Sequence, residues 1–228
     1  MTAGARFPLR CPPMSPSPIV SAVESAASEH RLLDHPYYRA WQEGELTADD
    51  LRRYAEQYRS FERCLPEVLS EAAVRTAPGR ARDLIEANLL DEISNPRPHI
   101  DLFDDFAAVV GAADHAEPTE ATAELIGVYR EAAAEGPVSL LAVVAAYESQ
   151  AAGIASTKAS ALAAHYGFDD KGVAFWAIHA EVEDRHAAWT VDALESLEAA
   201  PEDVDRWASR SARAWWGFLD EREALRAA

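Results

Sequence analysis

Three residues near the end of the chain have the types and the spacing of metal ligands. His179, Glu183 and His186 lie in a stretch that has no proline or glycine between Val173 and Pro201. In an α-helix, positions i, i+4 and i+7 share one face, so these side chains form one stripe, and apolar neighbours predict that it faces inward. Two imidazoles and a carboxylate on a buried face are costly unless something pairs with them, and a metal ion is the obvious partner.

Three further residues can complete such a site. Glu148 is an acid in a long apolar run, and Glu92 and His99 flank a proline-rich break. Three carboxylates and three histidines form a mixed oxygen and nitrogen set that suits iron or manganese, and two ions rather than one. A ferritin-like di-iron bundle uses Glu-x-x-His on two different helices, whereas this chain has that spacing only from Glu183 to His186.

The elements that would carry these residues are all helices. The 228-residue chain is rich in Ala, Glu, Leu and Arg, and no segment has the alternation of a strand. We expect a proline-rich disordered tail over residues 1–18 and one all-α domain over 19–228, a single bundle of about eight helices. Proline, glycine and capping residues place these helices at about 19–33, after Pro36 up to Gly44, from Thr47 to 75, 80–93, from Pro98, from Thr119 to 134, 138–165, 170–197 and from Pro201.

The charge of the chain excludes some classes of partner. The formal net charge of −18 argues against binding to nucleic acid or to anionic membrane surfaces, both of which need basic patches. We also expect no apolar run that spans a bilayer and no signal peptide, so the cytoplasm is the default location. Cys11 and Cys64 do not suggest a disulfide framework.

The order and spacing of the six candidate ligands resemble a known family. The pattern Glu92-x6-His99, then Glu148, then His179-x3-Glu183-x2-His186 is similar to that of the haem-oxygenase-like di-metal oxidases, whose helical fold is shared with thiaminase II and the pyrroloquinoline-quinone synthases. The resemblance covers about residues 19 to 220. It implies a haem-oxygenase-like bundle, two iron ions or one iron and one manganese, O2 and an external reductant as reactants, and a homodimer. Glu183 departs from the pattern, because relatives often have Asp there.

One branch of this family resembles the chain more closely, namely the chlamydial death-domain-associating protein and its bacterial relatives. That branch is implicated in an alternative route to p-aminobenzoate for folate, in which a tyrosine side chain of the protein supplies the ring and a lysine the nitrogen. The resemblance implies that Tyr38 is the sacrificed tyrosine, Lys158 the amino donor and Tyr54 an auxiliary tyrosine. The residues that carry it are His35-Pro36-Tyr37-Tyr38, Trp41 with Gly44-Glu45-Leu46-Thr47, Tyr54, Tyr147-Glu148-Ser149-Gln150 and Lys158.

The residues themselves add two expectations. A buried lysine readily loses its proton and becomes a nucleophile, which fits a donor role for Lys158. The resemblance also implies that the helix with the first Glu and His is often mobile and that the second metal ion is weakly held. The break at Pro96 and Pro98 gives a physical reason for this, because it removes backbone hydrogen bonds beside Glu92 and His99, and we expect partial occupancy.

Two other functions remain open from the sequence. One is a multiple-turnover enzyme on the same scaffold, an N-oxygenase or a carbon–carbon-cleaving oxidase acting on an amino acid or a fatty acid. The other is a non-enzymatic helical interaction module. Catalytic turnover with an intact Tyr38 would favour the first, and failure to bind iron the second.

Overall fold

The computed structural model describes residues 16–94 and 96–228, and these residues form helices and connecting loops without a strand. The all-α class expected from the sequence is confirmed. Most of the expected tail lies outside the described residues, and the first helix begins at Pro18. The helices are α1 (Pro18–Glu29), the 3₁₀ helix η1 (Leu32–Asp34), α2 (Pro36–Glu43), α3 (Ala48–Arg75), α4 (Arg80–Ser94), α5 (His99–Val109), α6 (Glu120–Glu135), α7 (Pro137–His165), α8 (Asp170–Ser196) and α9 (Pro201–Arg226).

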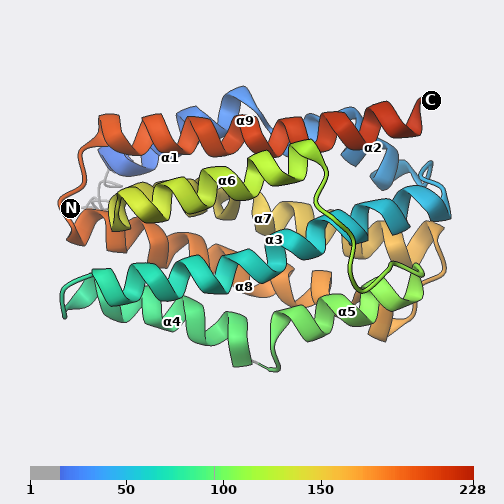
Figure 1. Cartoon of the computed structure of the whole chain (residues 1–228), viewed down its shortest axis with the longest axis horizontal. Helices are drawn as coiled ribbons and strands as arrows, with labels where there is room; N and C mark the ends of the chain where they lie inside the picture. The colour runs from blue at the N-terminus through green and yellow to red at the C-terminus, as the bar shows by residue number, and fades with distance from the viewer. Residues whose placement is uncertain (1–15, 95) are drawn as a thin grey trace, which may run out of the picture.

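Helix α7 lies at the centre of the bundle, where it packs against α8 and α9 and also contacts α1, α2 and α6 (Figure 1). The shorter helices α4 and α5 run end to end along one edge of the molecule, separated by the proline-containing break (Figure 1). Both of them pack against α3 and α8. Two helices, α3 and α8, therefore flank the segment on which Glu92 and His99 lie.

The first helix ends earlier than its sequence predicts. A single helix was expected to reach residue 33, but α1 ends at Glu29 and the chain resumes as η1. The cause lies far along the chain, because the side chain of Gln150 on α7 accepts a hydrogen bond of 2.9 Å from the backbone N–H of Leu32. A contact between residues so distant in sequence has no local signal.

Helix α7 corrects the expectation that no apolar segment is long enough to span a bilayer. Among the described residues it is the one helix whose length and composition meet that test, with a mean hydropathy of 1.4 over its best window. Most of that window is buried inside the protein, as expected for the central helix of a bundle. The two charged residues within the helix, Glu148 and Lys158, are both buried and face the interior.

Candidate metal centre

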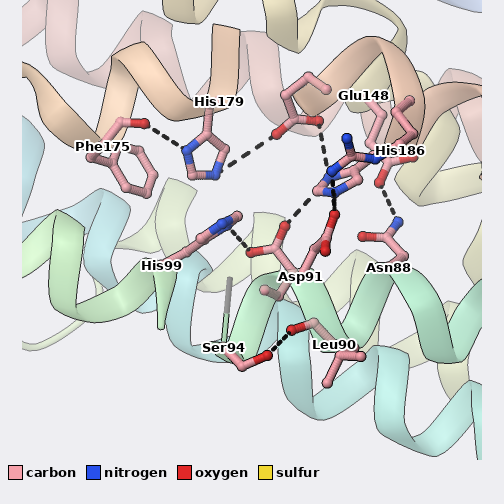
Figure 2. A network of polar contacts seen from close by, with 12 residues as sticks. Asn88, Leu90, Asp91, Ser94, His99, Glu148, Phe175, His179 and His186 are labelled. Atoms are coloured by element: carbon pink, nitrogen blue, oxygen red, sulfur yellow. Dashed lines mark hydrogen bonds and ion pairs between the residues drawn. The ribbon is translucent and has the colours of Figure 1, made fainter. Parts of the chain in front are cut away.

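The six side chains predicted as metal ligands lie together inside the bundle. They form two groups of three, and within each group the ligand atoms lie within 4.8 Å of one another. Figure 2 shows His99, His179, His186 and Glu148 directed toward one shared space between the helices. All six side chains are buried. The first group is Glu92, His99 and His179, and the second is Glu148, Glu183 and His186.

Four helices bring these residues together. Glu92 is on α4, His99 is the first residue of α5, and Glu148 is on α7. Helix α8 contributes to both groups, because its stripe of His179, Glu183 and His186 faces inward as the sequence predicts. This stripe is the shared wall of the two groups.

The two groups border each other through Glu92 and Glu183. One carboxylate oxygen of Glu92 lies 2.8 Å from Nδ1 of His99, and the other lies 3.6 Å from Nδ1 of His186 in the second group. One oxygen of Glu183 lies 3.8 Å from Nε2 of His179, and the other lies 3.8 Å from Nδ1 of His186. Each carboxylate therefore faces both groups, as a carboxylate that bridges two metal ions must.

Neighbouring groups orient two of the histidines. Nδ1 of His179 donates to the carbonyl oxygen of Phe175 over 2.8 Å, which directs Nε2 toward Glu183. Nε2 of His186 lies 3.2 Å from Oδ2 of Asp91, so its Nδ1 faces the site. A hydrogen bond of this kind fixes the tautomer and the ring orientation of a metal-binding histidine.

The electrostatics of the site favour a bound cation. Burial, followed by repulsion from Glu148 and Glu92, raises the pKa of Glu183 well above its usual value. Burial lowers the pKa of His179 to about 4, so this imidazole is neutral and can offer a nitrogen lone pair to a metal ion. Within the described residues, Oε2 of Glu183 and Nδ1 of His186 are buried without a hydrogen-bond partner. A metal ion would satisfy both of these atoms, the oxygen of a buried acid and the nitrogen of a buried imidazole. The six residues together fit a pair of ions.

A narrow cavity adjoins the two groups. Its wall includes Glu92, Glu148, His179 and Glu183. Its volume is about 10 Å³, which is room for about one water molecule. The rest of the wall comes from α3, α6 and α7 and is largely aromatic. Its members include Tyr58, Phe61, Glu62, Tyr129 and Tyr147.

Lys158, Tyr38 and Tyr54 form a second buried cluster. Nζ of Lys158 donates to the hydroxyl oxygens of Tyr38 at 3.0 Å and Tyr54 at 2.6 Å, and these two hydroxyls lie 2.9 Å apart. Nζ also lies 4.1 Å from the centroid of the Trp176 ring. The lysine is only 2% exposed, and burial holds its pKa well below the usual value. In the described part of the chain no carboxylate forms an ion pair with it, so the neutral amine is favoured.

Tyr58 connects the two clusters. Its ring stacks on that of Tyr54 with a centroid distance of 5.3 Å, and its hydroxyl lies 2.8 Å from that of Tyr147 in the wall of the cavity. An aromatic path therefore leads from the candidate metal ligands to Lys158.

Local structure sets the position of Tyr38. Helix α2 begins at Pro36, and Nδ1 of His35 accepts a hydrogen bond of 3.1 Å from the backbone N–H of Tyr37. The helix ends at Gly44, which has φ +75° and packs so tightly that a Cβ there would lie 2.6 Å from Cβ of His165. Only glycine suits that position without strain. Both ends of this short helix are therefore fixed.

Several residues at the site were missed in the sequence analysis. Glu62 occupies the helical stripe of Tyr54 and Tyr58, and its spacing of four residues after Tyr58 was a usable signal. Asp91 gave no such signal, because the role of an acid beside Glu92 depends on which way each one faces. The same is true of Asn88 and Thr190, which donate to the two carboxylate oxygens of Glu148 at 2.8 and 2.6 Å.

Comparison with known sequences shows relatives over most of the chain. Residues 52–216 match the model of a family described as iron-containing redox enzymes. A 4-aminobenzoate synthase from Chlamydia muridarum is 30% identical over 205 residues, which cover 87% of this chain and 87% of that protein. A 4-aminobenzoate synthase from Nitrosomonas europaea is 32% identical over 218 residues, covering 87% of this chain and 88% of that protein.

A solved structure shows the same fold. A TenA homologue from Pseudomonas syringae superposes with a TM-score of 0.73 at 15% sequence identity, and the match covers 91% of each chain. At this identity the likeness supports the helical architecture alone. The sequence matches go further, and with them the chain is shown to belong to the family of iron-containing redox enzymes with a haem-oxygenase-like fold.

Proposed function

We propose that this protein is an O2-dependent non-haem di-metal oxidase that forms p-aminobenzoate from the side chain of its own Tyr38, with Lys158 as the amino donor. The observation that carries the proposal is the contact of 3.0 Å between Nζ of Lys158 and the hydroxyl of Tyr38 inside the core. The names of the two relatives support the product, and the six buried ligands support a pair of iron ions or one iron and one manganese.

The atoms of a tyrosine side chain suit this product. Its ring carbons and Cβ together match the carbon skeleton of p-aminobenzoate in number and connection, so Cβ must become the carboxyl carbon. The reaction would therefore break the Cα–Cβ bond of Tyr38. One O2 would place both of its oxygen atoms on Cβ as the carboxyl group, and one hydrogen of Cβ would pass to Cα, so this cleavage balances without further electrons. The bound metal pair would supply the reduction of O2 and the oxidising power. The phenolic oxygen leaves as water when the amine of Lys158 replaces it. A second O2, with two electrons and two protons from the reductant, would oxidise Cε of Lys158, so that the Nζ–Cε bond breaks to release the aromatic amine and leaves an aldehyde at Cε and one water.

The residues of the second cluster suit the nitrogen transfer. Burial lowers the pKa of Lys158, so its amine keeps the lone pair that a nucleophile needs. Nζ lies 4.3 Å from the centroid of the Tyr38 ring, close to the carbon that it must attack. Tyr54 contacts both the amine and the Tyr38 hydroxyl, so it is placed to pass a proton between them.

The size of the cavity distinguishes this proposal from multiple turnover on a free substrate. About 10 Å³ beside the ligands suits one water-sized molecule, not an amino acid or a fatty acid. Tyr38, by contrast, is already buried beside Lys158 and needs no route of entry. The cavity therefore favours a substrate that belongs to the chain itself.

The test is a Tyr38→Phe variant, loaded with iron and supplied with reductant and O2. We expect its p-aminobenzoate to fall at least tenfold, because a phenyl ring lacks the oxygen that nitrogen replaces. In wild-type protein, peptide mass spectrometry should show loss of the side chain at position 38. Tyr37→Phe is the matched control, because Tyr37 is on the same helix but its hydroxyl donates to the carbonyl of Asp50. Wild-type yield from Tyr38→Phe would refute self-sacrifice.

We also propose a homodimer in the cytoplasm that draws electrons from a cellular reductant. Light scattering coupled to gel filtration tests the dimer directly, because a mass of one chain, 24.9 kDa, would contradict it.

A further inference from the structure

Glu62 is a buried acid that the six-ligand set does not use. It lies on α3, is 3% exposed and lines the same cavity as Glu92, His179 and Glu183. In the described residues it forms no ion pair with an arginine or lysine. A carboxyl group buried in this way is costly to ionise unless a cation lies nearby.

The charges of the site indicate a role for this acid. Two divalent metal ions carry four positive charges, whereas Glu92, Glu148 and Glu183 carry three negative ones when ionised. A fourth carboxylate would make the buried centre neutral, which removes the cost of burying a net charge. Glu62 lines the same cavity as Glu92 and His179, which both belong to the first group of ligands.

We propose that Glu62 is a fourth carboxylate ligand of the metal centre and binds the ion held by Glu92, His99 and His179. This inference rests on the proposed metal centre. In the structure Glu62 lines the cavity beside Glu92 and His179, and binding requires its carboxyl group to reach the ion, which the rotatable bonds of a glutamate side chain allow. Its helix supports the role: α3 packs against both α4 and α5, so a ligand on α3 would hold an ion whose other ligands lie on either side of the break.

The experiment is an anaerobic titration of iron-free protein with Fe(II) alone, read by calorimetry and by metal analysis. We expect wild type to bind two ions per chain and Glu62→Gln to bind the weaker one at least about tenfold less tightly. Glu62→Asp keeps the charge on a shorter side chain and should restore part of that affinity. Glu67→Gln is the matched control, because Glu67 is on the same helix but is exposed and pairs with Arg130 at the surface.

The outcomes separate the two proposals. If wild type binds no iron, the metal centre and the role of Glu62 both fail. If wild type and Glu62→Gln bind two ions with equal affinity, only the role of Glu62 fails. Equal losses in Glu62→Gln and Glu62→Asp also overturn it, because charge would then not matter. The Gln variant keeps the volume of the side chain and removes a charge that burial disfavours, so iron-free protein should not lose stability, and urea unfolding checks this.

Discussion

The carboxylate of Asp91 contacts the ring nitrogen of His186 that points away from the candidate metal ions. Its Oδ2 lies 3.2 Å from Nε2 of His186 and 2.5 Å from the guanidinium of Arg185. An anionic acceptor at this place keeps the proton on Nε2 and increases the electron density at Nδ1. The ligand quality of His186 therefore depends on a residue that does not itself face the ions.

We expect Asp91→Asn to weaken Fe(II) binding by about tenfold to a hundredfold, because a neutral amide is a poorer acceptor. Fe(II) titration without O2 measures the change. Asp192→Asn is the control, since Asp192 pairs with Arg80 on the surface. Unchanged affinity in Asp91→Asn would show that His186 is not a ligand or does not need this support.

Lys158 should leave a signature in the pH dependence of stability. Burial lowers its pKa in the folded protein, so the chain takes up a proton there on unfolding. Its stability therefore rises with pH between the folded pKa and the usual value. Lys158→Met lacks this effect, so the stability that it gains over wild type should shrink by up to about 1.4 kcal/mol per pH unit as pH rises.

Urea unfolding of iron-free protein at pH 7 and pH 9 measures this difference. Lys171→Met is the control, because Lys171 is exposed and its ion pair with Asp105 is at the surface. A constant difference between Lys158→Met and wild type across this range would mean that the amine stays charged in the core.

At the scale of elements, α2 positions Tyr38 through its first turn. His35 is fully buried, accepts from the N–H of Tyr37 through Nδ1, and contacts Asp220 of α9 through Nε2 at 3.1 Å. Burial lowers the pKa of His35, so Nδ1 remains free to accept. The same ring therefore caps α2 and attaches it to α9.

His35→Ala should lower the free energy of unfolding by about 1 kcal/mol, because the first turn of α2 loses its side-chain cap. His35→Asn should recover part of it, since asparagine is a good N-cap. Urea unfolding measures both. Wild type should also lose stability as pH falls below about 6.5, because the unfolded chain then binds a proton that the buried ring resists. Equal stability of the Ala variant would show that the cap is dispensable.

The break between α4 and α5 separates Glu92 from His99, so partial metal occupancy stays a prediction. Protein isolated without added metal should contain fewer than two ions per chain by quantitative metal analysis. The reason is that Glu92 and His99 of the first group lie on two helices that, among the described residues, no backbone hydrogen bond joins across the prolines. Two tightly held ions in untreated protein would contradict it.

At the scale of the whole molecule, the sequence predicts the helices better than their contacts. Prolines, glycines and caps such as Thr47 act locally, so the ends of α2, α3 and α7 are close to those expected. The inward-facing stripe of His179, Glu183 and His186 also follows from spacing, because a helical stripe is a local property. The pattern that adds Glu92, His99 and Glu148 depends on the resemblance to the family. The end of α1 depends on Gln150, and the roles of Asp91 and Glu62 depend on neighbouring helices. Such long-range contacts leave no periodic signal.

Iron should stabilise the whole bundle. Buried carboxylates repel one another without a cation, so an excess of Fe(II) at a hundred times its dissociation constant should add about 2.7 kcal/mol to the free energy of unfolding. Thermal unfolding without O2, before and after treatment with a chelator, measures this. Calcium is the control, because it prefers sites made of oxygen ligands alone and tests for a general effect on a chain of net charge −18. No difference between iron and calcium would contradict a specific site.

The complete burial of Tyr38 has a consequence for the end of the reaction. In the proposed reaction, a ring cut from this position would lie buried among Trp41, Tyr54 and Lys158. Escape would require α2 to lift away, an event of the kind that amide hydrogen exchange records as local opening. The opening rate of this eight-residue helix would then limit the rate at which each chain releases the product of the proposed reaction.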